Sequence, residues 1–124
     1  MARKVAFIVV LVGFCAFTAL ARAGLADVEN VRVERAADGT YTFHVTVRHA
    51  DKGWNHYADA WQVVLPDGTV AGTRELAHPH VDEQPFTRSL WGVKIPSGVE
   101  EVRVRARDKV HGFGGREMTA KIPR

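Results

Sequence analysis

From Asp27 onward, hydrophobic and polar residues alternate along the chain, and proline or glycine interrupts the alternation roughly every 8 to 12 residues. Between residues 42 and 48, for example, Phe43, Val45 and Val47 share one face of an extended chain, and polar residues occupy the other. No part of this region keeps the period of about 3.6 residues that marks an amphipathic helix. A period of two buries one face of each strand, so the sequence predicts an all-β domain.

The alternation divides the chain into seven short strands. The predicted segments are residues 28–35 and 41–49, a strand containing Trp61, Val63 and Leu65, residues 69–76, 86–93 and 101–108, and a last strand containing Met118, Ala120 and Ile122. Turns at Asp38-Gly39, Pro66-Asp67-Gly68 and Pro96-Ser97-Gly98 suit reversals between antiparallel neighbours. Seven antiparallel strands in about 100 residues, with a core tryptophan on the third, predict an immunoglobulin-like sandwich rather than a closed barrel. No pair of cysteines brackets Trp61, so this sandwich would lack a disulfide.

The first 23 residues have the layout of a signal peptide. A positively charged start, Arg3-Lys4, precedes an apolar stretch from Val5 to Leu20, and Ala21-Arg22-Ala23 forms an Ala-x-Ala cleavage site. The apolar stretch is short for a helix that must span roughly 30 Å of hydrocarbon. We therefore expect residues 1–23 to be removed after Ala23 and residues 24–124 to form the mature domain. The alternative is an uncleaved membrane anchor.

Cysteine usage indicates the compartment. The single cysteine, Cys15, lies in the apolar stretch, and lipid attachment would need a small residue before it, where the chain has Phe14. The expected mature chain contains no cysteine. An exported domain without disulfides is more typical of a bacterial periplasm or cell surface than of a eukaryotic secreted scaffold. We expect a periplasmic or secreted protein that has no membrane attachment after signal cleavage.

The charge balance argues against nucleic acid as a partner. The chain has 17 lysines and arginines, 14 acidic residues and a formal net charge of +3. Three of the basic residues lie within residues 1–23, which contain no acidic residue, so the mature chain would be neutral. Duplex nucleic acid is bound largely by neutralising its phosphates. Arg103, Arg105 and Arg107 project to one side of their strand, and we expect a solvated face neutralised by neighbours such as Glu117.

An antiparallel sandwich brings every second loop to the same end of the domain, because each strand reverses the direction of the one before. The loops at 50–58, 78–85 and 110–115 should therefore share one end, called here the histidine end. Five of the six histidines lie in these loops or at their edges: His49, His56, His78, His80 and His111. The carboxylates at this end are Asp51, Asp59, Asp82, Glu83 and Asp108. The opposite end is made of tight turns, so we expect the functional site at the histidine end.

Imidazole and carboxylate groups without thiolate or thioether partners suit copper(II) and zinc(II). The candidate metal ligands, in order of preference, are His78, His80, His111, His56 and His49. The first three lie in loops long enough to bend toward a common point, and Asp82 or Glu83 could supply an oxygen ligand or orient an imidazole. The sequence thus predicts an exported accessory protein that binds copper or zinc. In the alternative, the histidines are ordinary polar loop residues, since their spacing repeats no zinc-binding motif.

A second hypothesis assigns the same end a different role. Trp54 and Tyr57 lie in the loop at 50–58, and Phe113 lies in the glycine-rich stretch at 110–115. Large aromatic side chains in loops are either lids over the core or contact surfaces. The alternative function is therefore a metal-free module that contacts a periplasmic or cell-surface protein, or a glycan, through these three residues.

Enzymatic activity is not expected. Hydrolysis by a serine nucleophile requires a histidine and an acid beside the serine. Ser89 lies inside a predicted strand and Ser97 lies in a turn at the end opposite the histidines, so loop geometry pairs neither with such partners. The mature chain has no cysteine nucleophile either.

Two stretches carry a resemblance to known proteins. Residues 49–59, HADKGWNHYAD, and residues 78–89, HPHVDEQPFTRS, resemble those of small exported bacterial β-sandwich proteins of uncharacterised function. The resemblance covers most of the mature chain and implies the compartment and the fold, but no activity. The chain is more weakly similar to periplasmic copper carriers. It begins its expected mature part with Gly24-Leu25-Ala26, without the N-terminal histidine or the methionine cluster that such carriers use.

Overall fold

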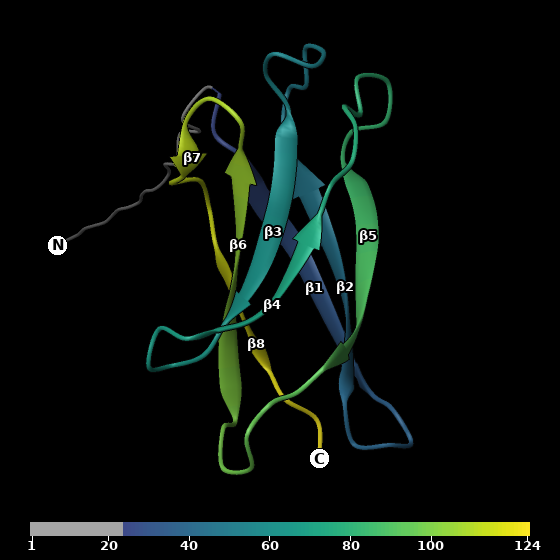
Figure 1. Ribbon diagram of the computed structural model, residues 1–124, viewed down its shortest axis with the longest axis vertical. Coiled ribbons are helices and arrows are strands. Elements are labelled where there is room, and N and C mark those ends of the chain that lie inside the picture. The colour runs from purple at the N-terminus through teal and green to yellow at the C-terminus, as the bar shows by residue number, and fades with distance from the viewer. Residues whose placement is uncertain (1–23) are drawn as a thin grey trace, which may run out of the picture.

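The computed structural model describes residues 24–124, and the expected signal peptide lies outside the described residues. Residues 24–124 form eight strands in two antiparallel sheets (Figure 1), which confirms the all-β prediction. Within this range there is no helix that is long and apolar enough to cross a membrane.

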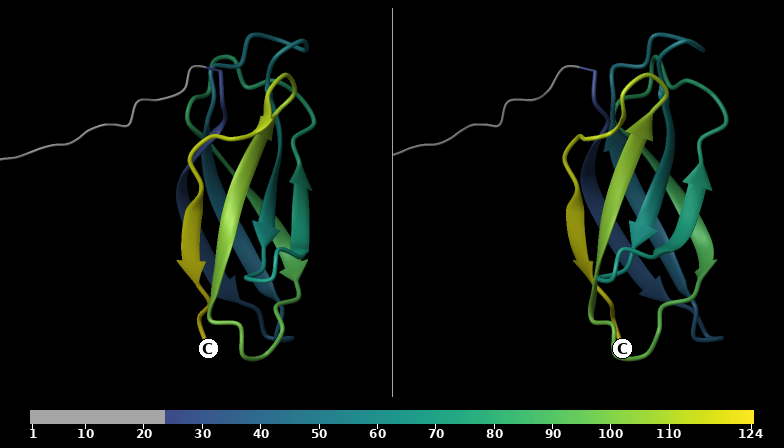
Figure 2. Two further views of the ribbon diagram at one scale, coloured as in Figure 1. Left: turned by 90° about the vertical axis from the view of Figure 1, so that its left-hand side faces the viewer. Right: turned by 60° about the vertical axis from the view of Figure 1, so that its left-hand side comes forward.

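The two sheets differ in size. The first has the strand order β1-β2-β5, with bounds β1 Asp27–Arg35, β2 Tyr41–Arg48 and β5 Phe86–Val93. The second has the order β4-β3-β6-β7, with β8 also paired to β6, and its bounds are β3 Ala58–Val64, β4 Val70–Glu75, β6 Glu101–Asp108, β7 Gly112–Phe113 and β8 Met118–Lys121. Figure 2 shows the two sheets from the side, with the strands of one facing those of the other.

All seven predicted strands are present, and an eighth, β7, lies in the glycine-rich stretch that we expected to be a loop. Its two residues pair with the end of β6, Phe113 with Arg107 and Gly112 with Asp108. A two-residue strand has no alternation, so the sequence pattern could not reveal it. The position of Phe113 matters because the hairpin from β6 to β7 holds the loop that follows Asp108.

Alternation in the sequence becomes burial between the sheets. Phe43, Val45 and Val47 of β2 are fully buried, as are the facing residues of β6, which alternate with half-buried arginines. Trp61 on β3 is 0% exposed and belongs to the same hydrophobic cluster. The structure therefore confirms Trp61 as a core residue.

The three arginines on the outer face of β6 have local partners, and carboxylates neutralise two of them, with Glu117 in the predicted role. Their partners are Glu117 for Arg103 (2.7 Å), the ring of Phe113 for Arg105 (4.1 Å to the centroid) and Asp59 for Arg107 (2.9 Å). The hydrogen bond that Arg107 donates to Asp59 raises the pKa of Arg107 above its ordinary value. This face thus combines two ion pairs with Arg105, which donates to the Oε1 of Gln62 and lies over the ring of Phe113.

The loops lie at the two ends of the domain as the sequence predicts. The connections β2–β3, β4–β5 and β6–β7 lie at one end of the domain, and the tight turns lie at the other (Figure 1). The start of the described chain also reaches the histidine end, because the carbonyl oxygen of Gly24 contacts His49 and His56 there.

Candidate metal centre

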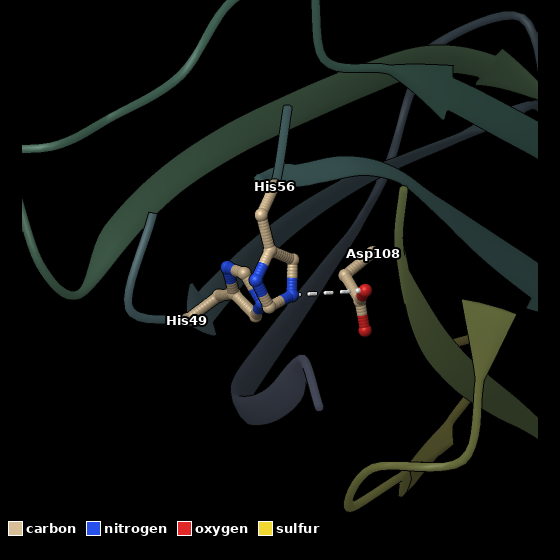
Figure 3. Close-up of side chains that lie close together, drawn as sticks. All are labelled: His49, His56 and Asp108. Atoms are coloured by element: carbon tan, nitrogen blue, oxygen red, sulfur yellow. Dashed lines mark hydrogen bonds and ion pairs between the residues drawn. The ribbon is translucent and has the colours of Figure 1, made fainter. Parts of the chain in front are cut away.

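His49, His56 and Asp108 converge at the histidine end (Figure 3). The Nε2 atoms of His49 and His56 are 3.2 Å apart, and His56 Nε2 is 3.3 Å from Asp108 Oδ1. One nitrogen or oxygen atom from each residue lies within 4.8 Å of the others. His49 directly follows β2, His56 lies further along the β2–β3 loop and Asp108 is the last residue of β6, so the cluster lies where the two sheets meet the histidine end.

A tight turn in the β2–β3 loop brings the two imidazoles together. The backbone nitrogen of His56 donates to the carbonyl oxygen of Gly53 (3.2 Å), and the nitrogen of Lys52 donates to the carbonyl oxygen of His56 (2.9 Å). Gly53 has a φ of 116°, which a residue with a side chain rarely adopts. The turn folds the loop back so that the rings of His49 and His56 meet edge to face, with centroids 4.7 Å apart.

Asp51 sets the orientation of His49. Its side chain is fully buried, and Oδ1 accepts hydrogen bonds from Nδ1 of His49 (2.6 Å) and from the backbone nitrogen of Ala58 (3.0 Å). The other oxygen, Oδ2, accepts from the backbone nitrogen of His80 (2.7 Å). When the ring is neutral and donates Nδ1–H to Asp51, it presents the Nε2 lone pair to the cluster. Metal-bound histidines are commonly oriented by a carboxylate in this way.

Asp108 is buried and only partly satisfied. Oδ1 accepts from the backbone nitrogens of Val110 (2.9 Å) and His111 (2.7 Å) and lies 3.0 Å from Nδ1 of His111. Oδ2 is buried and has no hydrogen-bond partner among residues 24–124. A buried carboxylate oxygen without a donor is costly. The oxygen that lies beside the imidazoles is Oδ1, 3.3 Å from His56 Nε2.

The structure separates the predicted histidines into two groups. His111 joins His56, with ring centroids 5.0 Å apart, so three of the five candidates surround Asp108. His78 and His80 pair with each other, with centroids 4.7 Å apart, and lie outside the group that could hold an ion. His80 is buried and stacks on Phe86 at 4.1 Å, which directs its ring into the core.

The predicted oxygen ligands also differ from the observed ones. Asp82 and Glu83 are exposed, and Glu83 pairs with Arg88 (3.0 Å), whose hydrogen bond lowers the pKa of Glu83. Asp108 and Asp51 instead lie beside the imidazoles. Asp51 is only two residues from His49, so the sequence indicated that the two could interact. The positions of the carboxylates in the loops did not show which of them would lie beside the imidazoles.

The aromatic candidates form a separate feature. Trp54 is 62% exposed and its ring meets that of Tyr57 with centroids 5.8 Å apart. Phe113 is half-buried beneath Arg105. Trp54 and Tyr57 therefore share a surface on the β2–β3 loop, whereas Phe113 packs on the arginine face of the second sheet.

The expectation that no serine meets a histidine and an acid is wrong. Ser89 Oγ lies 2.6 Å from Nδ1 of His44, and Nε2 of His44 lies 3.1 Å from Oε1 of Glu34. The three residues come from adjacent strands, with His44 directly opposite Ser89 in the ladder, a pairing that loop geometry does not reveal. In serine proteases Nε2 of the histidine faces the serine and Nδ1 faces the acid, whereas here Nδ1 faces Ser89 and Nε2 faces Glu34. Glu34 is also exposed, and it pairs with Arg32. We interpret this chain of hydrogen bonds as a link across the first sheet.

Acidification is expected to destabilise the fold through His80. Burial, reinforced by the charges of Arg88 and His78, lowers the pKa of His80 below 6.5, and neither ring nitrogen has a partner within residues 24–124. The unfolded chain therefore takes up the proton first, so stability is lost as the pH falls below about 6.5. Thermal unfolding followed by circular dichroism should show a smaller loss of Tm between about pH 7.5 and 5.5 in His80→Phe than in the wild type. An equal loss of Tm in both proteins would contradict this assignment.

Comparisons with known proteins add a relative without an assigned activity. No protein-family model matches the chain, and no solved structure matches it. The chain is 42% identical over 93 residues to a protein of Halomicrobium mukohataei named "Putative lipoprotein". The alignment covers 75% of this chain and 45% of that protein, so the chain spans less than half the length of the curated relative it matches. These findings agree with the resemblance to proteins of uncharacterised function.

Proposed function

We propose that this protein is an exported accessory protein that binds a divalent metal ion, copper or zinc, through His49, His56 and Asp108. The observation that carries the proposal is the spacing of the three side chains around one point. A tetrahedral ion with bonds of about 2.0–2.1 Å holds its ligand atoms roughly 3.3 Å apart. Two of the three separations match this value, 3.2 Å between the two Nε2 atoms and 3.3 Å between His56 Nε2 and Asp108 Oδ1, and all three ligand atoms lie within 4.8 Å of one another.

The electrostatics of the cluster also favour a cation. When His49 is neutral and donates its Nδ1–H to Asp51, its Nε2 carries a lone pair that faces His56 Nε2 across 3.2 Å. One proton can link the two imidazoles, but it leaves the buried Oδ2 of Asp108 without a partner. A divalent ion would satisfy both lone pairs and the carboxylate. Two imidazoles and a carboxylate suit zinc(II) and copper(II), whereas copper(I) prefers sulfur ligands.

The strand order supports an immunoglobulin-like sandwich as the scaffold. The first, second and fifth strands form one sheet, and the third and sixth strands pair at the centre of the other. The fourth strand pairs with the third, as an additional strand does in variable-type domains. Export is supported by the signal-peptide pattern of residues 1–23 and by the name of the relative, which suggests a cell-envelope or exported location.

The alternative function is a metal-free interaction module. The exposed Trp54, with the ring of Tyr57 against it, favours this reading. Elemental analysis of untagged protein purified from the cell envelope separates the two. Copper or zinc near one ion per chain supports the metal site, and metal-free protein that also fails to take up either ion supports the interaction module.

Loss of a cluster residue is expected to weaken metal binding without unfolding the domain. His56 is the best position for this test because its side chain is 21% exposed. Calorimetric titration of zinc(II) and copper(II) should show that His56→Ala lowers the affinity on the order of 100-fold, with Asp108→Asn showing a comparable loss. His78→Ala, an exposed histidine of the other pair, is the matched control and should bind like the wild type. Binding also requires neutral imidazole, so wild-type affinity should fall as the pH drops through about 6.5.

Two results with these variants would contradict the proposed site. Equal binding by the wild type and His56→Ala would move the site away from this cluster. Stronger loss in His78→Ala than in His56→Ala would place the ion on the second histidine pair. Thermal unfolding of each variant without metal distinguishes the loss of a ligand from the loss of the fold.

A further inference from the structure

The backbone of Gly24 lies inside the histidine cluster. Its carbonyl oxygen is 3.0 Å from Nε2 of His49 and 3.3 Å from Nε2 of His56. A Cβ atom at this position would lie 2.6 Å from Cε1 of His111, so the ring of His111 occupies the space that a side chain would need. Only glycine brings its main chain this close to the imidazoles. Gly24 is also the first residue of the expected mature chain.

With His49 neutral, ordinary hydrogen bonds satisfy these contacts only in part. With the Nδ1 proton of His49 held by Asp51, a neutral His49 ring directs a lone pair at the lone pairs of the Gly24 oxygen. His56 Nε2 has one proton at most, and it lies between the Gly24 oxygen, His49 Nε2 and Asp108 Oδ1, which all accept. A cation among these atoms would convert the opposed lone pairs into ligands. The separations of 3.0 and 3.3 Å again match two ligands of one ion, for which about 3.3 Å is expected.

The fold itself holds Gly24 in place. The residues that follow it are anchored to the segment before β8, since Val28 N donates to the carbonyl oxygen of Arg116 (2.8 Å) and Arg116 N donates to Oδ1 of Asp27 (2.7 Å). A Cβ added to Gly115 would meet the carbonyl oxygen of Ala26 at 1.9 Å, which shows how closely the two segments pack. The position of Gly24 therefore depends on contacts within residues 24–124.

We infer that Gly24 completes the metal centre with its carbonyl oxygen and, after cleavage behind Ala23, with its α-amino nitrogen. The inference rests on the proposed metal site and on the expected cleavage. Before cleavage, the nitrogen is an amide whose lone pair is delocalised into the carbonyl group. Hydrolysis by a signal peptidase adds one water across the Ala23–Gly24 bond and yields a carboxylate on Ala23 and a free amine on Gly24. That amine and the carbonyl oxygen of the same residue can bind one ion together in a five-membered chelate ring. The metal site would therefore be complete only after export and cleavage.

The test uses protein exported from the full-length gene, with intact mass establishing that it starts at Gly24. The comparison variant carries two glutamines inserted between Ala23 and Gly24, which adds no new Ala-x-Ala sequence and leaves the described residues unchanged. With intact mass showing that both glutamines are retained, the new amine is moved up to about 7 Å along the chain. We expect the insertion to weaken copper(II) binding at least tenfold in calorimetry. The Tm without metal should be equal in the two proteins, because the anchoring contacts remain.

A spectroscopic readout tests the ligand directly. In protein labelled with ¹⁵N-glycine and loaded with copper(II), paramagnetic resonance should show coupling to a glycine nitrogen in the exported protein and none in the insertion variant. Equal affinity and no glycine coupling, with His56→Ala still weak, would overturn the role of Gly24 and leave the metal centre standing. If neither protein binds better than His56→Ala, the proposed function fails as well. Retention of residues 1–23 in the exported protein would also overturn the inference.

Discussion

Trp61→Ala is expected to lower the free energy of unfolding by about 3 to 5 kcal/mol, because it removes a large aromatic side chain from a tightly packed core. Trp61 is 0% exposed and lies on β3, the strand between β4 and β6. A small domain is stable by only about 5 to 15 kcal/mol, so the variant should unfold in far less denaturant or fail to fold. Urea unfolding followed by circular dichroism measures the difference.

Trp91→Ala is the matched control. Trp91 lies on β5 and is 70% exposed, so its truncation should change the free energy of unfolding by less than about 0.5 kcal/mol. Trp61→Phe provides an intermediate case, because it keeps an aromatic ring and removes a buried indole nitrogen that has no partner within residues 24–124. Wild-type stability of Trp61→Ala would show that the assigned strand register is wrong.

Asp51→Ala is expected to cost about 3 to 5 kcal/mol of stability, since it removes one partner of a buried, hydrogen-bonded pair. The variant leaves three donors without an acceptor: His49 Nδ1 and the backbone nitrogens of Ala58 and His80. These donors belong to the β2–β3 loop, the start of β3 and the β4–β5 loop. Thermal unfolding should therefore show a large decrease in Tm, and any folded protein should bind zinc(II) more weakly than the wild type.

Asp82→Ala separates this effect from a general loss of charge. Asp82 is an exposed carboxylate in the β4–β5 loop, and its removal should leave both stability and metal affinity close to wild type. Asp51→Asn keeps the shape of the side chain but places an amide group near a backbone donor or the imidazole. It should thus be intermediate in stability. A stable Asp51→Ala protein with wild-type affinity would refute the positioning role of Asp51.

Much of the fold could be predicted because burial on one face imposes a period of two. The segment from Phe86 to Val93 and the segment from Glu101 to Asp108 appear as strands with the predicted bounds. The partner of each strand was harder to infer. The residues of β4 are mostly half-buried, so their pattern does not show that the strand pairs with β3 at the edge of the second sheet.

The candidate site shows a sharper limit of sequence reasoning. Strand reversal placed the histidines at one end, and this followed from counting loops. Two local features bring His49 and His56 into contact: the turn at Gly53 and the hydrogen bond between His49 Nδ1 and Asp51. Both depend on how the loops pack, which the spacing of residues along the sequence does not show. The link between His44 and Ser89 arises in the same way, from cross-strand register.

The central claim is that one ion binds between His49, His56 and Asp108. Crystals of the zinc-loaded protein, measured with anomalous scattering at the zinc absorption edge, test it most directly. The account predicts one strong anomalous peak at about 2.0 to 2.1 Å from Nε2 of both histidines and at about 2.0 to 2.2 Å from an oxygen of Asp108. A peak beside His78 and His80 instead, or no peak at the cluster in protein that has taken up zinc, would contradict it.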